Sequence, residues 1–204
     1  GLPLAAGATT INKMCGSGMK AAMLAHDLLL AGSARVVLAG GMESMTNAPY
    51  LLPKARGGLR LGHGQVLDHM FLDGLEDAYD RGRLIGTFAE DCAETFGFTR
   101  QAQDDYAIAS LTRAQAAIAS GAFAAEIAPV EAGRAGLITT DEQPGKARLD
   151  KIATLKPAFR PGGPVTAANS SSISDGAAAL VVTSGTEAEA RGLRPLARAL
   201  GHAA

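Results

Sequence analysis

A cysteine at a bend marked by Gly16 and Gly18 stands directly before a run of helical periodicity, and this junction constrains the fold more than any other part of the chain. Residues 10–21 are TINKMCGSGMKA, with the cysteine at position 15. Apolar residues then recur at three- and four-residue spacing as far as residue 30, and Gly32 supplies a stop signal. The pattern predicts a helix that begins just after Cys15.

The segment after this helix predicts a buried strand. Residues 35–41, RVVLAGG, form a short β-branched run that ends in glycines, which is typical of a strand covered on both faces. A helix followed by such a strand favours a layered α/β structure. A thiol at the amino end of a helix lies near unpaired N–H groups and the positive end of the helix dipole, which favour the thiolate and can hold an oxyanion. Cys15 is therefore the candidate nucleophile.

Three segments, in order along the chain, resemble the thiolase family. They are residues 12–20 with 38–45 (NKMCGSGMK and LAGGMESM), residues 86–90 (GTFAE) and residues 163–177 (GPVTAANSSSISDGA). The resemblance implies an α/β thiolase fold, with layered α/β/α core halves and an inserted helical loop domain, incomplete in this chain. It assigns residues 1–48 to the end of the amino-terminal half with the nucleophile, 49–165 to the inserted loop domain, and 166–204 to the start of the carboxyl-terminal half.

By the same resemblance the chain is expected to be an acyltransferase. Cys15 would take an acetyl group from one acetyl-CoA and pass it to the enolate of a second, which gives acetoacetyl-CoA and CoA; the reverse reaction is thiolysis of a 3-ketoacyl-CoA. Because donor and acceptor are both sulfur, the acyl-enzyme is neither a trap nor an uphill step. CoA thioesters are the implied substrates, fatty acid metabolism is the implied setting, and no metal or other cofactor is implied.

Two residues before the GTFAE glycine are expected to flank the bound acyl group. Several short-chain thiolases have a His-Met pair there, whereas this chain has Leu84 and Ile85. An apolar wall removes any polar contact to the ketone oxygen. The sequence therefore leaves longer or branched 3-ketoacyl-CoA substrates as alternatives to short ones.

Further CoA-binding residues follow from the resemblance. Phe159 would lie beside the pantetheine arm, with a core aromatic as the alternative, and Ala167 and Ser171 would line the CoA tunnel. Three basic residues before the last segment would bind the CoA phosphates, with a solvated loop face as the alternative interpretation. They are Lys146, Arg148 and Lys151.

Two parts of the family's catalytic set, a Gly-His-Pro segment and a carboxyl-terminal Cys-x-Gly segment, have no counterpart in the chain. His26 lies roughly 16 Å along the helix from Cys15, too far to activate it, and His202 is not followed by proline. Cys92 is expected to pack within a helix that a capping box of Thr87 and Glu90 begins. We expect the isolated chain to be inactive and another polypeptide to complete it.

The inserted loop domain contains one clearly bounded helix. Thr99 is a candidate N-cap, and the helix is expected to run towards Gly121, which suits a carboxyl-terminal stop. A helix in this place is expected to cover the tunnel.

Two other functions remain open. A thiolase-like protein that binds CoA or lipid without turnover fits the missing catalytic segments. Residues 16–21, GSGMKA, also match the G-x-G-x-x-A opening of a dinucleotide-binding fold, although the residues before them are too polar for the strand that this fold requires.

The composition of the chain limits the kinds of partner that it is expected to bind. The 19 basic and 20 acidic residues are scattered, which argues against a nucleic-acid surface. No apolar run approaches the ~20 residues of a membrane span. Two cysteines that pair poorly fit a reducing compartment, so a cytoplasmic location is expected. By resemblance, the partners are acetyl-CoA and acyl-CoA substrates and further copies of the chain in a dimer or tetramer.

Overall fold

The computed structural model describes residues 2–203, which form two compact units. One unit contains the residues as far as Gly74 together with those from Ile173 onward, and the other spans Leu75–Ser172. Each unit contains both helices and strands.

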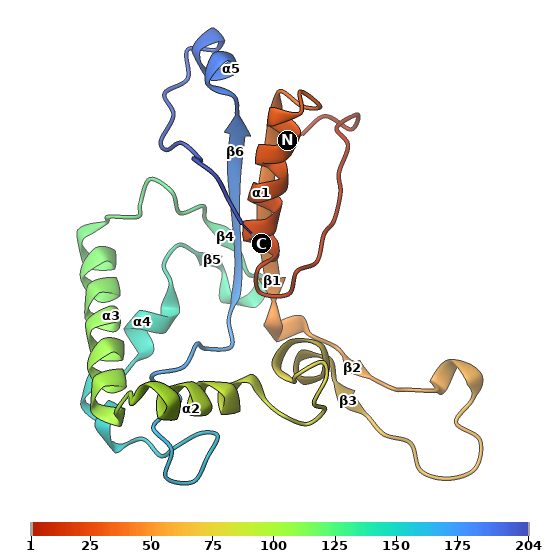
Figure 1. Ribbon diagram of the computed structural model, residues 1–204, viewed down its shortest axis with the longest axis vertical. Helices are drawn as coiled ribbons and strands as arrows, with labels where there is room; N and C mark the ends of the chain where they lie inside the picture. The colour runs from red at the N-terminus through yellow and green to blue at the C-terminus, as the bar shows by residue number, and fades with distance from the viewer. Residues whose placement is uncertain (1, 204) are drawn as a thin grey trace. The chain divides into compact units, whose positions relative to one another are not determined.

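In the first unit, helix α1 (Ser17–Leu30) lies along a two-stranded antiparallel sheet of β1 (Val36–Ser44) and β6 (Asp175–Thr183) (Figure 1). Helix and sheet approach closely because Gly18 faces Gly41, where an added Cβ atom would lie 3.1 Å from the Gly18 Cα. Since Gly41 faces the helix, Ala39 shares that face by strand alternation, and it is buried.

The predicted helix after Cys15 is confirmed, because α1 begins at Ser17 and Gly32 follows it with φ +69°. The prediction of a strand covered on both faces is wrong for β1. Leu38 and Met42 point to the face opposite α1, and they are 51% and 86% exposed. The β-branched composition therefore predicted a strand correctly but not its burial, since one helix covers one face of a two-stranded sheet.

Shorter elements complete the first unit. Strands β2 (Tyr50–Leu51) and β3 (Leu67–Asp68) pair antiparallel. Helix α5 (Gly185–Ala190) follows β6, and the Ser184 hydroxyl caps it by accepting a hydrogen bond from the Glu187 N–H. Short 3-10 turns lie at Met45–Asn47 and Ala55–Gly57, and a π-helical turn, Phe71–Leu75, ends one residue beyond the boundary of this unit.

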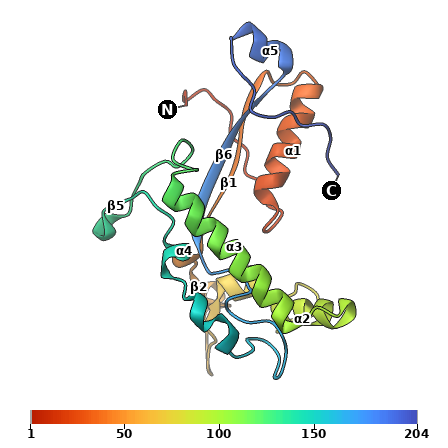
Figure 2. The same cartoon turned by 90° about the vertical axis from the view of Figure 1, so that its left-hand side faces the viewer.

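The second unit is mainly helical (Figure 2). Its elements are α2 (Ile85–Phe96), α3 (Arg100–Ser120), the antiparallel pair β4 (Val130–Glu131) and β5 (Leu137–Ile138), α4 (Glu142–Lys146) and the 3-10 segments Gly133–Ala135 and Leu149–Thr154. Helix α3 packs against α4 and against Leu149–Thr154. Its predicted bounds are confirmed: the Thr99 hydroxyl accepts a hydrogen bond from the Ala102 N–H at 3.1 Å, and Gly121 ends the helix with φ +68°.

The start of α2 differs from the predicted capping box. Leu84 is the N-cap residue, and the Thr87 hydroxyl donates to the Leu84 carbonyl at 2.7 Å instead of capping a later turn. Glu90 is buried, whereas Cys92 is exposed. The prediction that Cys92 is a packed thiol is therefore wrong. The buried residues of α2 are Gly86, Glu90 and Ala93, and Cys92 lies about 160° round the helix from Glu90, which faces the segment around Gly163.

Candidate active site

Cys15 is exposed and stands in a tight turn that leads directly into α1. The turn is closed by backbone bonds from the N–H of Gly16 to the Lys13 carbonyl and from the N–H of Ser17 to the Met14 carbonyl, at 3.0 and 3.1 Å. The Ser17 hydroxyl crosses the same turn, since it accepts from the Lys13 N–H at 2.8 Å and donates to the Met14 carbonyl at 2.7 Å. The thiol is therefore presented beside the amino end of a 14-residue helix, where the helix dipole favours negative charge.

The residue before the thiol has a strained backbone. Met14 has φ +51°, one of three non-glycine residues with positive φ among those described. This conformation costs a methionine about 1–2 kcal/mol, and the N–H of Met14 offsets part of the cost by donating to the Asn12 side chain at 2.8 Å. Strain of this kind concentrates at sites of function. Sequence reasoning missed this arrangement, although an Asn two residues before Met14 is a known turn signal.

In the second unit, Phe159 lies on the first turn of α2. A Cβ atom added at Gly86 would overlap the Phe159 ring, so the ring packs on the residue that directly follows Leu84 and Ile85. The next residue, Arg160, donates to the carboxylates of Asp91 and Glu94 on α2. The hydrogen bond from Arg160 holds the pKa of Asp91 below its usual value. These contacts hold the segment that carries Phe159 against α2.

A hydrogen-bonded network shapes the turn that contains Ala167 and Ser171. The Asn169 side chain accepts from the Thr166 N–H at 2.7 Å and donates to the Pro164 carbonyl at 3.0 Å. It also donates to Asp104 of α3 at 3.2 Å, and Asp104 is 4% exposed. Ala167 and Ser171 themselves are exposed on this turn.

A groove of about 890 Å³ brings together three of the predicted CoA-binding residues: Arg148, Lys151 and Ser171. The groove runs along α3, and Tyr106 of this helix and Phe98 just before it contribute aromatic rings. It therefore combines cationic side chains, which suit phosphate, with flat apolar surface, which suits a nucleotide base.

The three predicted phosphate-binding residues, Lys146, Arg148 and Lys151, differ in how closely they pair with acidic side chains. Lys146 pairs with Glu142 along α4 and does not line the groove. Arg148 makes two bonds to Asp150, at 3.0 and 2.9 Å, while Lys151 lies 4.0 Å from the same carboxylate. Of the three, Lys151 is thus the residue whose charge is least closely paired with an acidic side chain. Cys15 belongs to the first unit and the other predicted site residues to the second.

The family model described as "Thiolase, N-terminal domain" matches residues 1–186 of the chain. The chain belongs to the thiolase family. An acetyl-CoA acetyltransferase from Schizosaccharomyces pombe is 46% identical over 98% of this chain, and one from Escherichia coli is 47% identical over 95% of it. The alignments cover 52% and 50% of those proteins, so the chain spans about half the length of the curated relatives it matches.

Solved thiolase structures match the fold of the chain. An acetyl-CoA acetyltransferase from Syntrophomonas wolfei has a TM-score of 0.87 and 42% identity, covering 96% of this chain and 49% of that one. A thiolase from Ascaris suum, solved in complex with coenzyme A, has a TM-score of 0.87 and 38% identity, covering 95% of this chain and 50% of that one. The expectation of an α/β thiolase fold, represented in part, is confirmed.

Thiolase membership also decides how the glycines at 16–18 are interpreted. In a dinucleotide-binding fold a strand leads into the glycines, but the described residues before Gly16 contain no strand. The glycines serve the turn at Cys15 and the close approach of Gly18 to Gly41. Among residues 2–203, none of the helices combines the length and the apolar character that a membrane span requires.

Proposed function

We propose that this thiolase acts in the complete protein as an acetyl-CoA C-acetyltransferase, with Cys15 as the acyl carrier. The exposed thiol on a strained turn at the start of α1 is the observation that supports this assignment most directly. The names of the relatives point to the same activity.

The reaction follows from a thiolate at that place. The Cys15 sulfur attacks the carbonyl carbon of acetyl-CoA, a new C–S bond forms, and the bond to the CoA sulfur breaks to release the CoA thiolate. The C2 carbanion of a second acetyl-CoA, formed by loss of a proton to a base, then attacks the acetyl carbon. The C–C bond of acetoacetyl-CoA forms as the Cys15 thiolate leaves. The reverse sequence cleaves a 3-ketoacyl-CoA.

The second unit supplies the binding surface in this proposal. Leu84, Ile85 and Phe159 form an apolar wall for the acyl and pantetheine groups. Arg148 and Lys151 face the CoA phosphates across the groove, and Ser171 lies along it. Ala167 is proposed to line the CoA tunnel. Lys146 is proposed to bind the CoA phosphates from outside the groove.

The setting of the protein is also a proposal. A cytoplasmic location, a part in fatty acid metabolism and assembly into a homo-oligomer, as a dimer or tetramer, rest on the resemblance. Lack of activity in the isolated 204-residue chain is proposed on the same basis, because the chain contains no Gly-His-Pro or second catalytic cysteine segment.

The test is the mass of the complete protein after brief exposure to acetyl-CoA. We expect one acetyl group on Cys15, lost in Cys15→Ser and kept in Cys92→Ser, because both thiols are exposed but only Cys15 lies at a helix start. CoA binding with no adduct would identify a non-catalytic CoA-binding protein and contradict the proposal. Thiolysis at the wild-type rate by Cys15→Ser would contradict the role of Cys15.

A further inference from the structure

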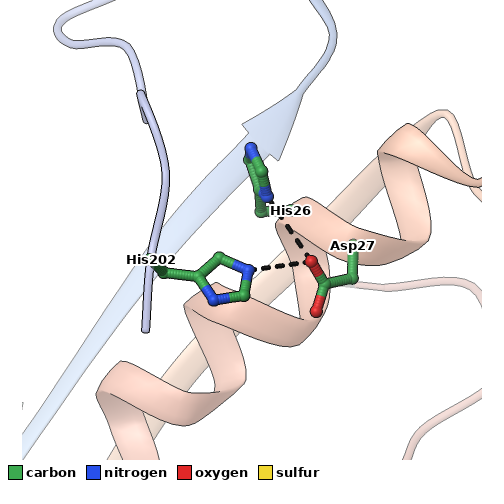
Figure 3. A group of neighbouring side chains, drawn as sticks. All are labelled: His26, Asp27 and His202. Carbon is green, nitrogen blue, oxygen red and sulfur yellow. Dashed lines mark hydrogen bonds and ion pairs between the residues drawn. The ribbon is translucent and has the colours of Figure 1, made fainter. Parts of the chain in front are cut away.

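A cluster of two histidines and one aspartate lies on α1 away from Cys15. His26 and Asp27 are neighbours near the end of the helix, and the carboxyl-terminal segment brings His202 alongside them (Figure 3). The Nε2 atom of His202 is 2.8 Å from Oδ1 of Asp27, and Nδ1 of His26 is 3.6 Å from the same oxygen. All three side chains therefore converge on one point within the first unit.

The His26 ring faces Asp27 at a distance too long for a hydrogen bond. Its Nδ1 atom is shielded from solvent and has no hydrogen-bond partner among residues 2–203. The two imidazole rings meet edge to face, with centroids 5.2 Å apart and planes at 84°. In this arrangement Nδ1 of His26 is turned towards Asp27 (Figure 3).

The three ligand atoms lie close enough together to surround one small ion. All three lie within 4.8 Å of one another. Zinc binds imidazole nitrogen and carboxylate oxygen at about 2.0–2.2 Å, which places two ligands of a tetrahedron roughly 3.3–3.5 Å apart. The His26–Asp27 separation already matches this spacing, and the shorter His202–Asp27 contact reaches it by a small outward rotation of exposed side chains.

The chemistry of the ligands favours a transition metal over the common hard cations. Two imidazoles with one carboxylate suit zinc, whereas magnesium and calcium prefer oxygen ligands. Each neutral ring can carry its proton on the nitrogen away from the cluster. The Asp27 side chain supplies a carboxylate oxygen, and a carboxylate binds a metal ion in its deprotonated form.

We propose that His26, Asp27 and His202 form a binding site for one divalent transition-metal ion of the zinc type. The three protein ligands leave the fourth tetrahedral position to water. The ion joins the carboxyl-terminal segment to α1, the helix whose first turn follows Cys15, and satisfies the shielded nitrogen of His26. The site is structural and takes no part in acyl transfer.

The test is calorimetric titration of the protein with Zn²⁺ alone, after Cys15→Ser and Cys92→Ser have removed both exposed thiols. We expect one ion per chain and no heat with Mg²⁺. His26→Gln and His202→Ala are each expected to weaken binding about tenfold or more, because each removes one of three ligands. His69→Ala is the matched control: His69 lies 3.0 Å from Asp73 as a similar pair without a third ligand, and its loss should leave zinc binding unchanged.

Two results would overturn the proposal. One is the absence of stoichiometric zinc binding by the cysteine-free protein, in which case the cluster is a hydrogen-bonded His–Asp–His group. The other is unchanged affinity in both histidine variants. X-ray absorption of the zinc-loaded protein does not depend on the folding of any histidine variant: two imidazole ligands and no sulfur are expected, and any other ligand set contradicts the site.

Discussion

The Phe159 ring rests directly on Gly86, and a side chain of any size at Gly86 would overlap it. One turn later along α2, Glu90 lies against Gly163 in the same way. Glu90 is 1% exposed, so the segment from Phe159 to Gly163 covers this side of the helix. Two glycines thus set the distance between α2 and the segment that carries the proposed pantetheine wall.

Gly86→Ala is expected to push Phe159 out of its place. Overpacking of this kind costs about 1–3 kcal/mol, and it should also weaken acyl-CoA binding, because the ring belongs to the proposed wall. Thermal unfolding and CoA titration measure the two effects. Gly185→Ala is the control, since Gly185 begins α5 with open space around it. Equal behaviour of the two variants would show that the contact with Phe159 does not matter.

Local sequence signals predicted the helices whose ends they mark. Thr99 and Gly121 bound α3 as expected, because an N-cap hydroxyl and a residue in the left-handed region act within one turn. Gly32 ends α1 for the same reason. The turn at Cys15 was predicted from its glycines, and its strained Met14 is a detail that an Asn two residues earlier can indicate.

Features that depend on distant segments were predicted less well. The burial of β1 depends on what covers its second face, and its β-branched residues carry no information about that. The buried side of α2 is set by Gly163, which is 73 residues from Glu90 in the numbering. Arg148 and Lys151 line the groove and Lys146 does not. This difference depends on the packing of α3 against Leu149–Thr154, which the local sequence does not reveal.

The Asp104–Asn169 contact leads to a prediction for the turn that carries Ala167 and Ser171. Asp104→Ala removes the acceptor for both Asn169 and Arg100, and leaving buried donors unpaired costs about 1–3 kcal/mol. The turn that carries Ala167 and Ser171 should loosen, so CoA should bind more weakly. Asp105→Ala removes an exposed carboxylate bonded to Gln101 and should change neither quantity. Similar losses in both variants would exclude a special role for Asp104.

The Asp91 carboxylate predicts a pH dependence of stability. The hydrogen bond from Arg160, together with the charges of Arg160 and Arg83, lowers the pKa of Asp91 in the folded protein. A lowered pKa means that the stabilisation is present above the unfolded value of about 3.9 and is lost as the pH falls through the folded value. The melting temperature of Asp91→Asn should therefore be lower than wild type at pH 7, and the difference should shrink below pH ~4. A difference that stays constant down to low pH would contradict this linkage.

The Ser17 hydroxyl ties the turn around Cys15 to the start of α1, which leads to a prediction for the thiol itself. Ser17→Ala removes the bond from the Lys13 N–H and the bond to the Met14 carbonyl, and each is worth about 0.5–1.5 kcal/mol. Since Met14 already occupies a strained conformation, the turn should relax and Cys15 should lose its fixed place beside the helix end. Alkylation of Cys15 by iodoacetamide near neutral pH is therefore expected to slow relative to that of Cys92.

Ser120→Ala is the matched control, because the Ser120 hydroxyl also donates to a carbonyl three residues earlier, at the far end of α3. If the two variants give the same ratio of Cys15 to Cys92 labelling, the turn does not control the reactivity of the thiol.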